Sequence, residues 1–310
     1  MAQQTEVQWT GKTGGGNFGQ RFLFGFLKSV KVTVLYPVLP LVVPVYCVVN
    51  HKAFGCIFRY FKEIHHFSRW KSFWKTIGNH LIFGQVVLDR FAVVAGNKTQ
   101  FHLEIEDPEV LLQLLDQPGG AILAGSHIGN FELTGHCLSQ NKKRINSVIY
   151  GGEGVLMQQK RTNAFSHSNV RLVPVAEDLS HLFIIKEALE NGEIVTILCD
   201  RIWGSKKTLT IDILGKKAKL PLGTFLLAAQ MGVPVVSVIN IKVRGRKYHS
   251  YVQPLASPDR TLPLRQQSEQ IAASYAQSLE NVLRLHPEQW FNFFDFWERE
   301  IENGKREIEN

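Results

Sequence analysis

Beyond about residue 100, short apolar runs alternate with amphipathic segments. Runs rich in β-branched residues predict strands at Ala121–Ala124, Ser147–Tyr150, Val170–Val173, Ile194–Leu198, Leu209–Ile213 and Val235–Ile239. Helical spacing of apolar positions predicts helices over Leu179–Leu189, Thr224–Met231 and Leu264–Leu285, of which the first two end near Gly192 and Gly232. Strands interleaved with helices predict an α/β domain over residues 101–310.

The most apolar stretch of the chain lies earlier, at residues 34–49. It reads VLYPVLPLVVPVYCVV, sixteen uncharged residues interrupted by three prolines. A transmembrane helix needs about 20 apolar residues. Extending the stretch backwards to that length includes Lys28 and Lys31, whose charges are costly inside a bilayer. The pattern therefore leaves open whether this segment spans a membrane or lies on one.

Basic and aromatic residues are mixed on both sides of this stretch. Helices lying among lipid headgroups show this pattern, with rings buried and ammonium groups in water. An ordinary helical subdomain with an aromatic core is the alternative. We predict that residues 1–100 form a helical region that associates with an anionic phospholipid surface. The residues concerned are Arg21, Lys28, Lys31, Lys52, Arg59, Lys62, Arg69, Lys71 and Lys75, with Phe54, Phe58, Tyr60, Phe61, Phe67, Trp70, Phe73 and Trp74.

Composition narrows the class of protein. Of the 310 residues, 45% are hydrophobic, too many for a disordered chain. Thirty-five basic against 27 acidic side chains give a net charge of +8, which favours a phospholipid surface, nucleic acid or an acidic carrier protein as partner. Four cysteines without a CxxC pair exclude zinc ribbons and disulfide scaffolds and indicate a reducing compartment. The polar, glycine-rich start does not resemble a secretion signal.

The candidate chemistry lies directly after the first predicted strand, in a turn that contains His127 and leads to Glu132. Five positions on one regular helix place two side chains about 140° apart, so the pair can converge only if His127 lies in the turn and Glu132 in the first helical turns. The carboxylate would then fix the imidazole tautomer and leave the other ring nitrogen to accept a proton. A chance spacing is the alternative. The end of a strand, where open α/β sheets form ligand crevices, favours the dyad.

Two other functions compete with this interpretation. A metallohydrolase could use His127, Glu132 and His136, or the distant His167 and His181, but H-x4-E-x3-H is no established metal-site spacing. A basic membrane-binding or nucleic-acid-binding protein without catalysis would also fit the charge. No RNP, KH or helix-turn-helix pattern is present, and the basic aromatic residues adjoin the most apolar segment. We therefore predict neither a metal site nor a nucleic-acid partner.

Four segments in the same order resemble the lysophospholipid acyltransferase superfamily, in the branch of the late acyltransferases of lipid A biosynthesis. The segment AGSHIGNFEL resembles its H-x4-D/E motif in the glutamate form. The others are Cys199-Asp200-Arg201, the pair Ile211–Gly215 and Leu220–Thr224, and the closing His286-Pro287-Glu288-Gln289-Trp290-Phe291. Together they cover about residues 120–297.

The resemblance implies a fold, a reaction and a place in the cell. The fold is a mixed, mainly parallel sheet flanked by helices. The reaction is transfer of a fatty acyl group from an acyl thioester, of acyl carrier protein or coenzyme A, to a hydroxyl or amine of a lipid or glycolipid acceptor. His127 would be the general base and Glu132 would orient it, with no metal or organic cofactor. The place is the cytoplasmic face of the bacterial inner membrane.

Five further residues are candidates for binding substrate. Asp200 and Arg201 could bind an acceptor phosphate or order the active site, although a salt-bridged surface loop explains them equally well. Arg161 could hold a phosphate or the acidic carrier, with solvated surface as the alternative. Gly223 could let the backbone approach substrate, unless it only begins a helix. Asn130 could hydrogen-bond the turn or cap the following helix.

Overall fold

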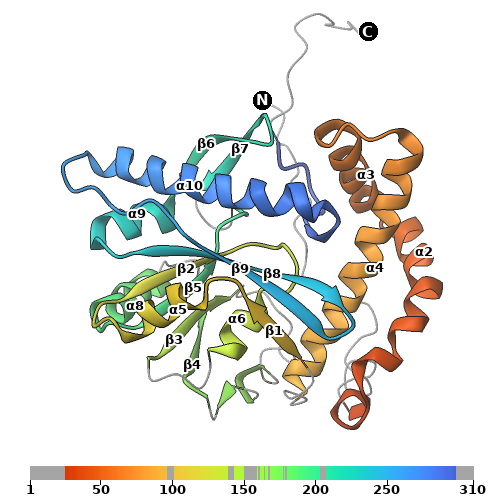
Figure 1. The fold of residues 1–310 in the computed structure, drawn as a ribbon, viewed down its shortest axis with the longest axis horizontal. Helices are drawn as coiled ribbons and strands as arrows, with labels where there is room; N and C mark the ends of the chain where they lie inside the picture. Colours follow the sequence, from red (N-terminus) through yellow and green to blue (C-terminus); the bar gives the residue numbers. More distant parts are fainter. Residues whose placement is uncertain are drawn as a thin grey trace, which may run out of the picture.

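A computed structural model describes residues 25–95, 101–138, 143–149, 159, 161–163, 165–166, 168–176, 178, 180–202 and 207–297. Its centre is a seven-stranded sheet with the order β1-β9-β8-β2-β5-β3-β4 (Figure 1). All neighbouring strands run parallel except β8 and β9, which form an antiparallel hairpin. The expected α/β fold with a mixed, mainly parallel sheet flanked by helices is therefore confirmed.

Five of the predicted strands belong to the main sheet. They are β2 (Ala121–Gly125), β3 (Ile145–Ile149), β4 (Val170–Pro174) at one edge, β5 (Ile194–Leu198) and β8 (Val235–Arg244). β5 matches its prediction residue for residue, whereas β8 extends five residues beyond the predicted end. Tyr150, the predicted end of the second strand, lies outside the described residues. Continuous apolar runs of this kind are typical of parallel strands covered on both faces.

Three strands were not predicted, two in the main sheet and one in a separate hairpin, because charged or polar residues interrupt their apolar positions. β1 (His102–Ile105) forms one edge of the sheet, and β9 (Lys247–Pro254) alternates buried with less buried positions. The predicted strand at Leu209–Ile213 exists as β6 (Thr208–Ile213). It lies outside the main sheet and pairs with β7 (Lys216–Pro221) in a separate antiparallel hairpin.

Helices connect and cover the strands. α5 (Pro108–Asp116) precedes β2, and α6 (Glu132–Cys137) follows it. α8 (Ser180–Glu190) and α9 (Leu222–Met231) lie close to their predicted ranges, and α10 (Leu264–Leu285) matches its range. Leu179, the predicted start of α8, lies outside the described residues. A short 3-10 turn, η5 (Pro287–Gln289), follows α10 and leads the chain back to the sheet.

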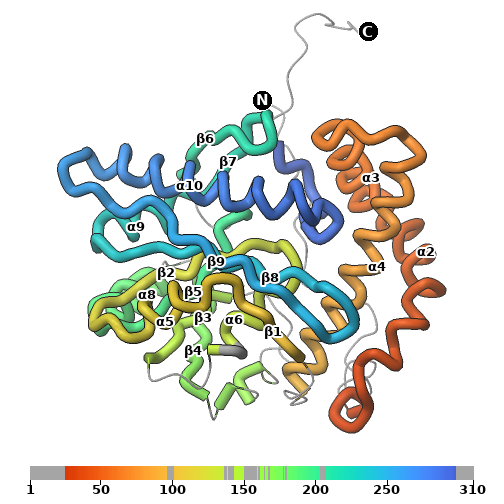
Figure 2. Tube along the Cα trace, viewed as in Figure 1, coloured from red at the N-terminus to blue at the C-terminus, as the bar shows by residue number. Residues whose placement is uncertain are grey.

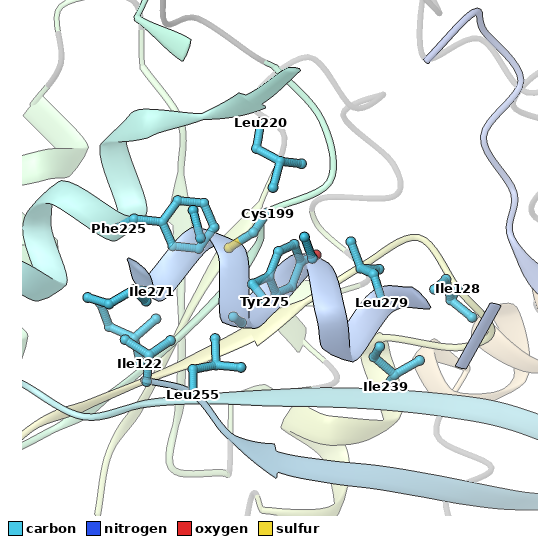
Figure 3. Close-up of a cluster of buried hydrophobic side chains, with 14 of the residues drawn as sticks. Ile122, Ile128, Cys199, Leu220, Phe225, Ile239, Leu255, Ile271, Tyr275 and Leu279 are labelled. Carbon is cyan, nitrogen blue, oxygen red and sulfur yellow. The ribbon is translucent and has the colours of Figure 1, made fainter. Parts of the chain in front are cut away.

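Alternating side chains of the central strands face two separate apolar layers. Ile122 and Ala124 of β2 pack in the larger cluster with residues of α8, α9 and α10, whereas Ala121 and Leu123 pack in a second cluster with α5. Figure 3 shows Phe225 of α9 and Ile271, Tyr275 and Leu279 of α10 gathered in the larger cluster. Burying both faces fixes the register of the strands, because a shift of one residue would exchange the faces. The ends of β2 and β5 are therefore held side by side.

The N-terminal helices form a layer beside this domain. They are η1 (Val32–Val34), η2 (Tyr36–Val38), α2 (Leu39–Val49), α3 (His51–Arg59), the π-helical turn η3 (Tyr60–Ile64) and α4 (Arg69–Val94). Two segments, Val32–Val49 and Arg69–Val94, are long and apolar enough to cross a membrane by length and composition alone, and 17% and 44% of their apolar windows are buried. Two of the three prolines stand at helix starts, where the missing N–H costs nothing, and Pro44 lies inside α2.

Candidate active site

The turn between β2 and α6 places His127 beyond the end of the sheet. Gly129 makes this turn possible, since its φ of +59° is left-handed and a Cβ there would stand 1.9 Å from the Asn240 carbonyl oxygen on β8. Only glycine fits both the backbone angle and this close approach. The turn is thus pressed directly against the neighbouring strand.

Three backbone hydrogen bonds hold the turn in place. The Gly129 N–H donates to the Gln289 carbonyl at 2.8 Å, and the Asn130 N–H donates to the Asn240 carbonyl at 2.8 Å. The Phe291 N–H donates to the His127 carbonyl at 3.1 Å. The closing segment after α10 therefore supports the turn, which gives the P-E-Q-aromatic motif a structural role.

Asp200 is the carboxylate that contacts the imidazole. β5 is the parallel neighbour of β2, with Leu198 opposite Gly125, so the residues after the two strands meet. Asp200 Oδ1 lies 2.7 Å from His127 Nδ1, and Oδ2 accepts the His127 N–H at 2.8 Å and the Trp290 indole N–H at 3.1 Å. The Asp200 side chain is 0% exposed, whereas that of His127 is 19% exposed. The carboxylate is thus fixed by three donors and the ring reaches solvent.

The protonation states follow from these surroundings. Burial and the nearby Arg201 charge lower the pKa of His127, although Asp200 acts in the opposite direction. Burial would raise the pKa of Asp200, but the interactions with His127 and Arg201 overcome it and lower the pKa to about 2. Near neutral pH the carboxylate is therefore ionised and the imidazole neutral. Its Nδ1–H donates to Asp200, which leaves Nε2 as a proton acceptor.

The prediction that Glu132 orients His127 is wrong at the level of contacts. Glu132 does begin α6, as expected, but its Oε1 accepts from Arg90 Nε at 2.9 Å and from an Arg161 N–H at 2.5 Å. Its Oε2 has no hydrogen-bond partner among the described residues. The pKa of Glu132 is lowered, because the two guanidiniums outweigh the effect of burial. Oε1 of Glu132 is therefore bonded to two cations, and the His127 ring is bonded to Asp200 instead.

Two arginines, Arg201 and Arg90, lie near the imidazole. The Phe131 ring lies 5.6 Å from the His127 ring in an edge-on arrangement, and the Arg90 guanidinium lies 4.7 Å from the centre of the Phe131 ring. Arg201 donates to the Phe291 carbonyl at 2.7 Å. Two arginine charges, those of Arg201 and Arg90, contribute to the lowered pKa of His127. The site therefore suits an anionic group or a developing negative charge.

The backbone N–H groups of residues 127–130 in the turn all have acceptors within the protein. The N–H groups of His127, Gly129 and Asn130 already donate to Asp200, Gln289 and Asn240. That of Ile128 faces the Ser126 hydroxyl at 3.4 Å. These four backbone donors are therefore already engaged within the protein.

Of the four other predicted residues, two arginines join the site, whereas Asn130 and Gly223 do not take the predicted role. Arg161 and Arg201 join the site as described, whereas Asn130 is fully buried beneath it and pairs with Asn240 through its backbone. Gly223 is exposed in the first turn of α9, where a Cβ would meet nothing within 4 Å, so no close approach there requires a glycine.

The histidines of the metal alternative do not form a described cluster. His181 accepts the Ala176 N–H at 3.2 Å, while His167 and the His136 side chain lie outside the described residues. Within the described part of the chain, no three His, Cys, Asp or Glu residues stand together as metal ligands.

Sequence reasoning missed Arg90 and the role of Trp290. Arg90 lies on α4, 42 residues before Glu132, and no local pattern connects the two. Trp290 belongs to the buried core, and its indole N–H also reaches Asp200. The position of Asp200 did carry a signal, because it follows a buried strand as His127 does, and adjacent parallel strands bring such residues together.

The family model for the bacterial lipid A biosynthesis acyltransferases matches residues 80–299. The chain belongs to this family. The match begins within α4 and therefore includes Arg90 as well as the turn, the β5 end and the closing segment. No match to the sequence was found among curated proteins. Membership makes acyl transfer to a lipid A-like acceptor the general activity, and proteins of this family are membrane-associated.

Proposed function

We propose that the protein transfers a fatty acyl chain from an acyl thioester to a hydroxyl or amine of a lipid or glycolipid acceptor, with His127 as general base. The observation that carries the proposal is the His127–Asp200 pair at 2.7 Å, in which the carboxylate is fully buried and the imidazole side chain is 19% exposed. A neutral imidazole fixed by a buried carboxylate is the arrangement that general-base catalysis requires.

In the reaction, His127 Nε2 accepts the proton of the acceptor hydroxyl or amine while the acceptor oxygen or nitrogen attacks the thioester carbonyl carbon. The carbonyl π bond opens and its oxygen becomes negatively charged. When the carbonyl re-forms, the carbon–sulfur bond breaks and the imidazolium returns the proton to the departing thiolate. The products are an ester or amide and a free thiol. Asp200 stabilises the imidazolium that forms between the two steps.

Arginine side chains stabilise the negative charge in this scheme. Arg201 and Arg90 lie close enough to the imidazole to lower its pKa, and the backbone donors of the turn are already bonded. Glu132 acts through others: it is a positioning residue that holds Arg90 and Arg161 beside the site. One carboxylate between two guanidiniums leaves a net positive charge, which suits an acceptor that carries a phosphate.

The donor and the cellular setting complete the proposal. An acidic carrier protein bearing the acyl thioester fits the net charge of +8 better than a neutral donor does. The scheme needs no metal or organic cofactor. The cytoplasmic face of the bacterial inner membrane is where a carrier-bound donor and a lipid acceptor meet.

The test is to incubate the full chain with acyl carrier protein loaded with a radiolabelled acyl group, together with total bacterial lipid extract. We expect label in a lipid product and none with His127→Ala. Acyl coenzyme A in a parallel reaction distinguishes the two donors. Equal labelling by the His127→Ala variant would show that His127 is not the base. The mass of the labelled product identifies the acceptor.

A further inference from the structure

The segment that contains the most apolar stretch runs antiparallel along the whole of α4. Val32 and Phe91 pack in one cluster at one end. Towards the other end, the Tyr46 and His80 rings lie 6.1 Å apart and the Phe54 and Phe73 rings 5.7 Å apart. In the middle, a Leu39 methyl carbon lies 3.0 Å from where a Cβ at Gly84 would stand. The axes of α2 and α4 are therefore close and nearly parallel.

From Asn79 to Arg90, another side of α4 is fixed to the α/β domain. Asn79 donates to the Trp290 carbonyl at 2.9 Å, the Phe83 ring lies 4.9 Å from that of Phe293, and Arg90 bonds Glu132. Near the end of α4, Asp89 pairs with the buried Lys242 of β8. α4 is thus the middle layer between α2 and the catalytic domain, as Figure 2 shows.

The outward side of α2 and the turns before it is an apolar strip. Its exposed fractions reach 77% at Leu41 and 76% at Val48. Exposed cations stand at both ends, Lys28 and Lys31 at one and Lys52 at the other. The strip consists of Val34, Val38, Leu41, Val42, Val45, Tyr46, Val48 and Val49.

We infer that this apolar strip lies flat in the surface of an anionic phospholipid bilayer and does not cross it. α4 lies alongside α2 and is fixed to the charged α/β domain. If α2 crossed the bilayer, α4 and this domain would have to enter the hydrocarbon layer with it, where charges are costly. An in-plane helix instead buries its apolar side to about 5–10 Å and keeps flanking cations at the headgroups. Because only α4 separates the strip from Glu132, the catalytic turn lies one helix layer from the lipid.

A second part of the chain extends this surface. The tip of the β8–β9 hairpin carries Arg244 and Lys247, both exposed, and Val243, which is 61% exposed. The Tyr36 hydroxyl donates to the Gly245 carbonyl at 3.2 Å, which ties the tip to the start of the strip. At the other end, Trp70 is 71% exposed. Cations and an indole at the rim of an apolar strip match an anionic lipid surface.

The first experiment measures binding of the full chain to sealed vesicles of phosphatidylcholine with phosphatidylglycerol. Leu41→Glu is expected to weaken partitioning into the vesicles roughly tenfold or more, because it places a carboxylate in the strip that contacts lipid. Phe183→Glu on α8 is the matched control, since Phe183 is also 77% exposed and α8 lies away from α2 (Figure 1). Equal partitioning of the two variants would overturn the inference. Thermal melting confirms that both are folded.

The second experiment tests the in-plane arrangement against a span. A fluorescent protein that matures only in the cytoplasm is fused to either end of the full chain in bacteria. The in-plane arrangement predicts fluorescence from both fusions, because residues on either side of the strip stay in one compartment. A single span at Val32–Val49 separates the two ends, so fluorescence from only one fusion would overturn the inference. Neither experiment uses an acyl substrate, so their failure is distinguishable from failure of the acyltransferase proposal.

Discussion

Two carboxylates, those of Asp200 and Glu132, adjoin the same turn, and the charges of their partners differ. Asp200 is bound by an imidazole, a backbone N–H and an indole N–H. Glu132, which is 10% exposed, is bound by two guanidiniums. A carboxylate bound by neutral donors keeps a net negative charge, which can stabilise a nearby imidazolium. A carboxylate bound by two guanidiniums instead compensates their charge and fixes their positions. The H-x4-E spacing therefore identifies residues that gather around the site, but it does not identify which carboxylate serves the base.

Asp200→Asn is the strongest way to break this comparison. The amide no longer enforces the Nδ1–H tautomer or stabilises the imidazolium, so kcat for acyl transfer should fall by on the order of 10³–10⁴. Steady-state labelling with acyl carrier protein as donor measures the change. Glu132→Gln is the matched control, because it makes the same carboxylate-to-amide change on the other side of the turn. A larger loss of kcat in Glu132→Gln would restore the glutamate as the orienting residue.

Glu132→Gln should act first on stability. Removing one partner of a buried ion pair leaves unpaired charge, here on Arg90 and Arg161, and should lower the free energy of unfolding by about 3 kcal/mol. Urea unfolding checks this value. The double variant Glu132→Gln with Arg90→Gln should recover part of the loss, since one of the two charges is then removed. Additive losses would show that the pair is not coupled.

The same substitution should also change how stability depends on pH. The pKa of Glu132 is lowered in the folded state, so its contribution is present above the ordinary glutamate pKa and is lost as pH falls through the lower folded value. Glu132→Gln should therefore flatten the acid side of the stability curve. Unfolding midpoints from neutral to acidic pH measure this effect, and an unchanged acid slope would contradict it.

The sequence predicted elements at the buried centre of the fold because the spacing and length of each apolar run there fit one type of secondary structure. β5 and α10 were placed residue for residue. β1 and β9 were missed because their inclusion depends on pairing with β8 and with one another, which is a tertiary effect that local propensity does not contain. The β6–β7 hairpin has strand-like sequence but pairs only with itself.

For the site, the sequence pointed to His127 but not to the carboxylate that contacts it. His127 follows a strand directly, so its position depends on local structure alone. The partner depends on which strand lies beside β2, and on α4, whose Arg90 draws Glu132 away from the ring. Both are long-range contacts that no spacing along the chain encodes. The family resemblance pointed to His127 and Glu132 as a pair, but in the structure Glu132 contacts Arg90 and Arg161, and His127 contacts Asp200.

Trp290→Phe should have a moderate effect. It removes one of three donors to Asp200 but keeps most of the ring packing, and a lost hydrogen bond to a charged group is worth about 1.5–3 kcal/mol. We expect kcat to fall roughly tenfold, with KM little changed, because the indole touches the carboxylate and not the substrate. Trp297→Phe is the control: its N–H donates to the Ile213 carbonyl in the same aromatic cluster, away from Asp200. Equal losses in both variants would assign the effect to packing.

The smallest expected effect is a shift of the acid limb of the pH–activity profile, the range in which activity rises with pH. Burial and Arg201 lower the pKa of His127, so activity should rise with pH and reach its plateau below the usual histidine range. Asp200 opposes that shift, and the residual activity of Asp200→Asn should therefore show its acid limb at still lower pH. Glu132 contacts Arg90 and Arg161 and not the imidazole, so Glu132→Gln should move the limb less than Asp200→Asn does. The pH profile of kcat/KM for the three proteins measures this. A limb that moves with Glu132 and not with Asp200 would reverse the assignment of the two carboxylates, whatever the sizes of the rate losses.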